Sequence, residues 1–178
     1  MILLTMTPVM IHTHQCMTTV IGPQAHRPRV TIAEPTAADT PRVLEMVQRC
    51  SRTSLFHRFH GFTDAVDSAR VLLARTDTLV AWSDDQCVGM ATLARAGDGT
   101  ADLGVLVEDD WQRRGVGSRL IAAAVDAATR GGTAVVQAEV LGDDGFIVAL
   151  LRRIGPINVT SGSGGYSVTL DLTDRLSA

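Results

Sequence analysis

The stretch that decides the fold is Val105-Leu106-Val107-Glu108-Asp109-Asp110-Trp111-Gln112-Arg113-Arg114-Gly115-Val116-Gly117-Ser118. It joins an extended apolar run, Ala101 to Val107, to a strongly helical run, Val116 to Thr129, through a polar loop. A strand-to-helix junction of this kind directs several backbone N–H groups and the positive end of a helix dipole at one point. The stretch therefore predicts a phosphate-binding loop.

Two glycines and two arginines in the loop support this prediction. Gly115 and Gly117 allow a tight turn and bring the backbone close to a ligand, because neither carries a Cβ atom. Arg113 and Arg114 add positive charge at the rim, where they can contact phosphate oxygens.

The spacing of the glycines distinguishes this loop from two common phosphate-binding loops. A dinucleotide-binding G-x-G-x-x-G loop follows its strand directly, whereas a polar segment separates Val107 from Gly115. Its third glycine is also missing, because Leu120 occupies that place. A P-loop needs the string G-x-x-x-x-G-K-[ST], which the sequence does not contain.

The remaining pattern, Gln112-x-x-Gly115-x-Gly117, matches the signature [QR]-x-x-G-x-[GA]. In this the chain resembles the GNAT family of acetyl-CoA-dependent N-acetyltransferases, and the resemblance covers about Arg29 to Leu172. It implies an α/β fold with a central mixed sheet of six to seven strands flanked by about four helices. It also implies transfer of an acetyl group to a primary amine by direct attack, without an acyl-enzyme.

The order of the predicted elements agrees with that fold. Short turns between three successive strands indicate an antiparallel half-sheet, and a later strand-helix-strand crossover indicates a parallel pair. The cap of the first helix is placed close to Asp39 or Thr40, because Pro41 fits only in a first turn. The predicted strands are Arg29–Ala33, Thr78–Trp82, Cys87–Leu93, Ala101–Val107, Thr133–Val140, Ile157–Thr160 and Tyr166–Leu172. The first predicted helix ends at about Arg49, and the later ones span Asp64–Ala74, Val116–Thr129 and Phe146–Arg153.

The resemblance also implies where acetyl-CoA binds. The pantetheine arm would pair with the strand before the motif, and the pyrophosphate would lie on backbone N–H groups of the loop. Many members place an asparagine against the cofactor arm where this chain has Asp144. Many also have a tyrosine that acts as the general acid, at the position of Leu151 in this chain. Water, or less directly Tyr166, would then protonate the leaving thiolate. The candidate cofactor-binding residues are Val105, Leu106, Val107, Gln112, Arg113, Arg114, Gly115, Val116, Gly117, Ser118 and Asp144.

Asp102 is the candidate general base. By the strand period of two it lies on the face opposite Ala101 and Leu103, among apolar residues, and the family often has a carboxylate, usually Glu, on this strand. Because aspartate is one methylene shorter, a water relay is favoured over direct contact with the amine. The alternative is an exposed aspartate that closes the turn before the strand, and Glu108 and His60 are reserve candidates.

The segment Ser51 to Phe62 holds three of the four phenylalanines and two of the five histidines. It resembles the S-x-x-S-x-[YF]-x-R-F segment of some GNAT proteins, including bacterial protein-lysine acetyltransferase domains, where it lies near the acceptor. The alternative is that Phe56 and Phe59 are core residues. The acceptor stays open between a small amine and a protein lysine. The acidic Asp144 and the missing tyrosine also keep open a non-catalytic module that binds acetyl-CoA or another ligand.

Composition limits the other classes of function. The 178 residues suit one domain, and a net charge of −3 with a pI near 5.9 gives no basic surface for nucleic acid. No apolar run approaches the ~20 residues of a membrane-spanning helix. Three scattered cysteines, Cys16, Cys50 and Cys87, fit neither a disulfide framework nor a metal site, and they favour a reducing cytoplasm. A homodimer is left open.

Residues 1–28 are expected to form a flexible N-terminal arm, followed by the acyltransferase domain over 29–178. The arm mixes Met, Thr, His and Pro without a period, and its His12, His14 and Cys16 have no second cluster to complete a metal site. Removing residues 1–28 should therefore leave the melting temperature and the CoA affinity nearly unchanged. Thermal melts and calorimetry of the truncated chain check this, and a large loss of stability would mean that the arm packs on the domain.

Overall fold

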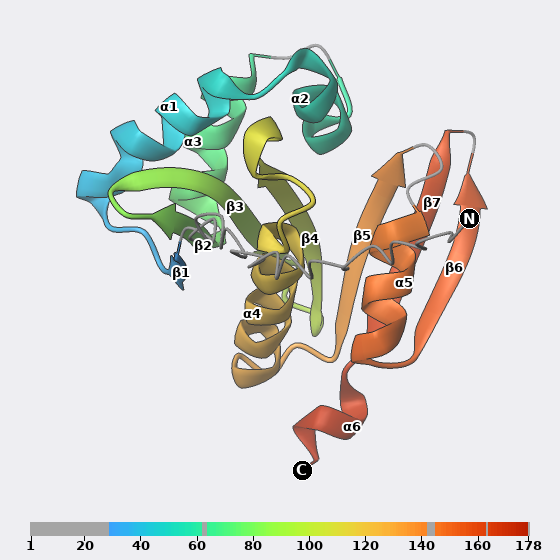
Figure 1. Ribbon diagram of the computed structural model, residues 1–178. Coiled ribbons are helices and arrows are strands. Elements are labelled where there is room, and N and C mark those ends of the chain that lie inside the picture. The colour runs from blue at the N-terminus through green and yellow to red at the C-terminus, as the bar shows by residue number, and fades with distance from the viewer. Residues whose placement is uncertain (1–28, 62–63, 142–144, 163, 178) are drawn as a thin grey trace, which may run out of the picture.

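The computed structural model describes residues 29–61, 64–141, 145–162 and 164–177. Their strands form one mixed sheet of seven strands in the order β1-β2-β3-β4-β5-β7-β6 (Figure 1). Strands β4 and β5 run parallel, and the other neighbouring strands are antiparallel. The strands are β1 Val30–Ala33, β2 Asp77–Ser83, β3 Gln86–Arg95, β4 Thr100–Val107, β5 Val135–Leu141, β6 Ile157–Gly162 and β7 Gly165–Asp171.

The predicted helices are present, and two further helices occur that the sequence analysis did not predict. Asp39 is the N-cap of α1 and Pro41 lies in its first turn, as expected. The additional α2 begins after Ser51, whose hydroxyl accepts a hydrogen bond from the Ser54 N–H, and α6 follows β7. The helices are α1 Thr40–Arg49, α2 Arg52–Phe59, α3 Ala65–Arg75, α4 Val116–Arg130, α5 Gly145–Ile154 and α6 Thr173–Leu176, with short 3-10 helices η1 Ala37–Asp39 and η2 Asp109–Trp111.

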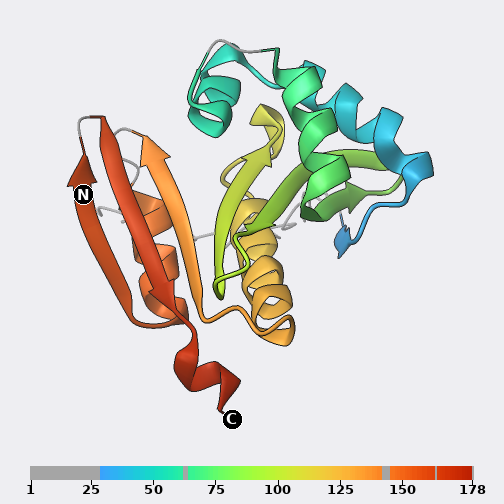
Figure 2. The same cartoon turned by 180° about the vertical axis from the view of Figure 1, so that it is seen from behind.

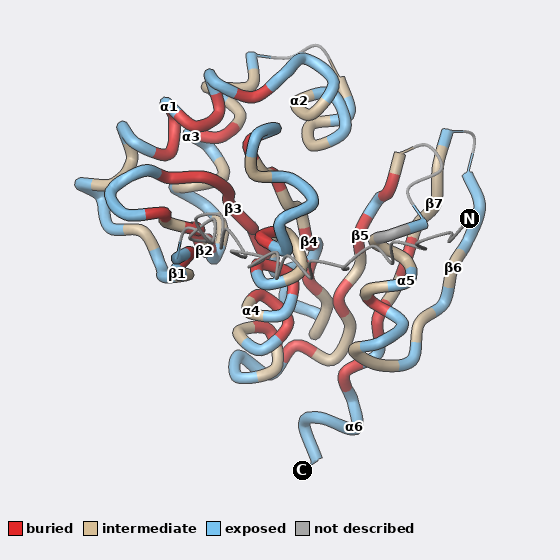
Figure 3. Tube along the Cα trace, viewed as in Figure 1, coloured by how far each residue is buried: buried red, intermediate tan, exposed pale blue. Residues whose placement is uncertain are grey.

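Helices cover both faces of the sheet, and each face has its own core (Figures 1 and 2). On one face α4 packs against β2, β3 and β4 and α5 packs against β6 and β7, and Leu120, Val125 and Leu151 are buried in the core that they share. Helices α1 and α3 pack on the opposite face through residues such as Met46 and Ala69. The buried segments accordingly run along the strands and the inner sides of the helices (Figure 3).

The two parallel strands, β4 and β5, pair only over a short stretch, and the candidate site lies where they separate. Only Thr100 to Asp102 of β4 pair with β5, opposite Val135 to Gln137. Beyond that point the two strands diverge, and α2 lies near the wide end of the gap (Figures 1 and 2). The later part of β4, from Leu103 to Val107, therefore has an edge that β5 does not pair.

Among the described residues, no helix is long and apolar enough to cross a membrane.

Candidate active site

The loop between β4 and α4 leaves the start of α4 open. Gly115 is the N-cap residue with a left-handed φ of 82°, which glycine adopts without strain, and no side chain caps the helix. The first ladder bond of α4 runs from the Arg119 N–H to the Gly115 carbonyl. The N–H groups of Val116, Gly117 and Ser118 belong to the first turn, which has no acceptor within its own helix. An anion can therefore be bound by these groups.

The unpaired edge of β4 leads directly into this loop. Val105 and Val107 pack with their side chains against the α4 core, whereas Leu106 points to the opposite core. The Gln112 side chain donates to the Val107 carbonyl over 3.1 Å and so fixes the loop to the strand end. The candidate cofactor residues of β4 and of the loop thus follow one another along the chain, with the side chains of Leu106 and Val116 buried, while Asp144 lies outside the described residues.

A cleft of about 440 Å³ lies on the α2 side of the gap between β4 and β5. Its charged and titratable lining comes from three elements that are far apart in the sequence. Helix α2 and its C-cap contribute His57, Arg58 and His60, β4 contributes Asp102, and β5 contributes Glu139. A carboxylate beside an open strand edge can accept a proton from an amine held in this cleft.

Asp102 lies at the last paired position, where β4 and β5 begin to separate. Its carboxylate is exposed and accepts a hydrogen bond of 2.6 Å from the Gln137 side-chain amide on β5. The turn before β4 is closed by Asp98, which accepts from Thr100, so Asp102 is not needed there. The structure therefore does not support the alternative in which Asp102 closes this turn.

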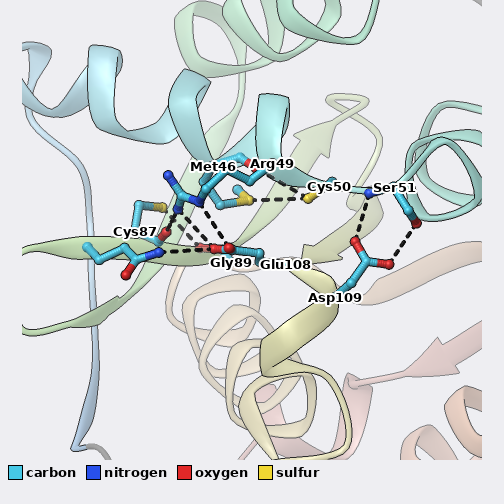
Figure 4. A network of polar contacts seen from close by, with 9 residues as sticks. Met46, Arg49, Cys50, Ser51, Cys87, Gly89, Glu108 and Asp109 are labelled. Atoms are coloured by element: carbon cyan, nitrogen blue, oxygen red, sulfur yellow. Dashed lines mark hydrogen bonds and ion pairs between the residues drawn. The ribbon is translucent and has the colours of Figure 1, made fainter.

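The two reserve candidates have different surroundings. Glu108 is buried, and both of its oxygens accept hydrogen bonds of 2.9 Å from Arg49 (Figure 4). The hydrogen bond to Glu108 raises the pKa of Arg49. Glu108 does not line the cleft, so it is poorly placed to act as a base. His60 does line the cleft, at the C-cap of α2 with a left-handed φ of 54°.

Glu108 should contribute to stability rather than to catalysis. Glu108→Ala leaves Arg49 without its carboxylate, and we expect the free energy of unfolding to fall by about 1–3 kcal/mol, since Arg49 is partly exposed. Asp126→Ala is the matched control, because its ion pair with Arg175 is exposed and should contribute about 0.5 kcal/mol or less. Urea unfolding measures both. Equal stability of the Glu108→Ala protein and the wild type would contradict this assignment.

A polar network ties α2 to the cofactor loop. Asp109 accepts hydrogen bonds from the Ser51 N–H and hydroxyl, both at 2.7 Å, and from the Ser54 hydroxyl at 2.8 Å. Gln112 donates to the Ser54 hydroxyl over 3.0 Å. Burial raises the pKa of Asp109, but the hydrogen bonds from Ser51 and Ser54 outweigh it and hold the pKa below its usual value. The network thus fixes the helix that carries Arg58 beside the loop.

The remaining candidates for acid or nucleophile do not face the cleft. Burial raises the pKa of the Cys50 thiol to about 12 and that of Cys87 to about 11, so both stay protonated near neutral pH. Leu151 is fully buried in the α5 core, and Tyr166 packs against that core without lining the cleft. Among the described residues, no group of three or more His, Cys, Asp or Glu side chains could hold a metal ion.

Two charged cleft residues were not singled out from the sequence. Glu139 shares the outer face of β5 with Gln137, and the alternation of Gln137, Ala138, Glu139 and Val140 is the signal that could have identified it. Arg58 stands in the sequence analysis only as part of a motif, because a sequence does not show whether a charged side chain points into the fold.

The two phenylalanines suggested as core residues differ in the structure. Phe56 is 38% exposed, whereas Phe59 packs in the core of α1 and α3.

Most of the chain matches one family of known proteins. Residues 42–155, well over half of the chain, match the family model described as Acetyltransferase (GNAT) family. A search of curated proteins finds no matching sequence.

Solved structures share the fold at low sequence identity. The GNAT domain of S. lividans PAT is 21% identical, with a TM-score of 0.67 over 83% of this chain and 98% of that one. The ribosomal-protein-S18-alanine N-acetyltransferase of Escherichia coli is 20% identical, with a TM-score of 0.62 over 82% and 95%. The paia N-acetyltransferase of Thermoplasma acidophilum, solved in complex with coenzyme A, is 13% identical, with a TM-score of 0.61 over 80% and 99%.

Proposed function

Because this chain belongs to the GNAT family of acetyltransferases, we propose that it transfers the acetyl group of acetyl-CoA to a primary amine, of a small molecule or of a protein lysine. One observation carries the proposal: β4 and β5 separate beside an α4 N-terminus that has no side-chain cap. The opening offers a strand edge to an extended ligand arm, and the helix start offers N–H groups to its phosphates.

Each part of acetyl-CoA has a proposed partner. The amides of the pantetheine arm pair with the backbone of Val105 to Val107, which β5 leaves unpaired. The pyrophosphate binds the N–H groups from Arg113 to Ser118, with charge from the exposed Arg113 and Arg114 side chains. This placement puts the thioester at the edge of the cleft that Asp102 lines.

The reaction needs a deprotonated amine beside a fixed thioester. Asp102, directly or through a water, accepts one proton from the amine while the nitrogen attacks the thioester carbonyl. The new C–N bond forms, the C–S bond breaks, and the CoA thiolate takes a proton from water, while the hydroxide so formed takes back the proton held by Asp102. Gln137 acts as a positioning residue, because its amide holds the Asp102 carboxylate at 2.6 Å.

A thiol-release assay with acetyl-CoA tests the proposed activity. The panel holds small primary amines, free amino acids and a lysine peptide, and we expect CoA release with at least one of them. Calorimetry with CoA runs in parallel and reports cofactor binding separately. Binding of CoA without thiol release for any panel member would favour the alternative of a non-catalytic sensor of acetyl-CoA.

The proposal also covers the setting in which the chain works. Cys50 and Cys87 are free and buried, which is compatible with a reducing cytoplasm. We propose that acetyl-CoA and an amine acceptor suffice as partners, without a metal ion.

A further inference from the structure

Arg58 is an inward-turned cation in the part of the cleft where the acceptor would lie. Its guanidinium lies over Gly104 of β4, so closely that a Cβ atom at Gly104 would overlap the guanidinium. One terminal nitrogen donates to the buried Thr92 hydroxyl over 2.6 Å, and the guanidinium carbon lies 5.2 Å from the centre of the Phe59 ring. Arg58 therefore occupies a defined position on the floor of the cleft.

The charge of Arg58 is not compensated by the described part of the chain. No carboxylate among these residues forms an ion pair with it, and its Nε–H is buried without a hydrogen-bond acceptor. Burial lowers the pKa of Arg58 to about 10, so the side chain remains charged near neutral pH. A buried charge without a partner is costly unless a ligand supplies the opposite charge.

The carboxylates of the cleft lie apart from this cation. Asp102 and Gly104 are two residues apart on the same face of β4, which places their Cα atoms about 7 Å from each other at the usual strand rise. His57 and His60 line the cleft from the same helix end as Arg58, while Glu139 lines it from β5. The cleft thus holds the Arg58 cation over Gly104 and the Asp102 carboxylate two residues earlier on the same strand, without an ion pair between them.

From this arrangement we propose that Arg58 binds a carboxylate of the acceptor, so that the preferred acceptors are free amino acids whose carboxylate lies close to the reacting amine. The inference rests on the proposed acetyl transfer and assigns its substrate class. Arg58 determines specificity in this account and takes no part in bond making. A guanidinium is well suited to the task, because its planar donors match a carboxylate in geometry.

The test compares amino acids with their C-terminal amides, which share the amine and the side chain but lack the carboxylate. The quantity compared is the ratio of kcat/KM for the amino acid to kcat/KM for its amide. We expect this ratio to be about tenfold or more higher in the wild type than in Arg58→Met, since the variant loses a hydrogen bond to a charged group. Amidation also lowers the pKa of the amine, so the change in the ratio between the two proteins is the quantity compared. Arg58→Lys should recover part of the preference.

A second variant separates recognition from folding. Gly104→Ala keeps the charge but displaces the end of the flexible Arg58 side chain, and we expect the same loss of preference with an unchanged affinity for CoA. A merely structural Arg58 would lower turnover of acid and amide equally, and an unchanged ratio in Arg58→Met would overturn the inference. Thiol release only with amines that lack a carboxylate would overturn it too and leave acetyl transfer intact. Release with no amine at all would overturn both.

Discussion

Replacing Asp102 with asparagine should lower turnover about a hundredfold or more while leaving the affinity for CoA unchanged, because the amide cannot accept the proton of the attacking amine. Asparagine keeps the shape of the side chain and can still bond with Gln137, so the fold and the cleft should persist. The measurement is kcat/KM across pH for both proteins. The variant should be slower than the wild type at every pH, because it lacks the carboxylate that accepts the proton.

Glu139→Gln is the matched control, since Glu139 is the other described carboxylate that lines the cleft. We expect its turnover to fall less than about tenfold, because it lies on β5 beyond the paired end of β4. A hundredfold loss in Glu139→Gln together with a near wild-type rate in Asp102→Asn would move the base to β5. A near wild-type kcat/KM in Asp102→Asn at every pH would by itself reject Asp102.

Adding a side chain at Gly117 should block the pyrophosphate without disturbing the protein. A Cβ atom there would lie 3.7 Å from the Val107 side chain, which is an ordinary contact, so the protein itself leaves room for alanine. A ligand bound on the adjacent N–H groups would meet that atom. We expect calorimetry to show CoA affinity reduced about tenfold or more in Gly117→Ala and further in Gly117→Val, through steric contact and lost hydrogen bonds.

The neighbouring glycine is a weaker test site, because Gly115 has a left-handed φ and any replacement there also strains the loop. Gly164→Ala is the better control: it adds a methyl group in the β6–β7 turn, where no atom lies within 4 Å of the new Cβ. It should change neither the melting temperature nor the CoA affinity. A folded Gly117→Val protein with wild-type affinity for CoA would refute the placement of the pyrophosphate.

The sequence alone was sufficient to predict the elements that depend on short stretches of residues. The glycine spacing of the loop, the proline in the first turn of α1 and the alternation along β4 depend on short stretches, and the structure has the same elements there. Helix α2 was not predicted as a helix, although Ser51 caps it locally, because part of its stabilisation comes from distant residues. Ser51 is held by Asp109, which is far along the chain, and no propensity argument contains that contact.

The charged groups of the cleft illustrate the same limit. The period of two places Asp102 on one face of its strand, but it does not reveal that Gln137 of β5 holds the carboxylate. Glu108 has the correct parity and a suitable chemical type, yet Arg49 of α1 occupies both of its oxygens. Which carboxylate is available and which is paired depends on tertiary contacts.

The most direct test of the account is a crystal structure of the protein with acetyl-CoA. The account predicts that the pantetheine arm enters between β4 and β5 and pairs with Val105 to Val107. The pyrophosphate should lie within hydrogen-bonding distance of the N–H groups of Val116 to Ser118, with the acetyl group directed to the cleft lined by Asp102 and Arg58. Acetyl-CoA bound elsewhere on the surface, with the β4–β5 opening empty, would contradict the central claim.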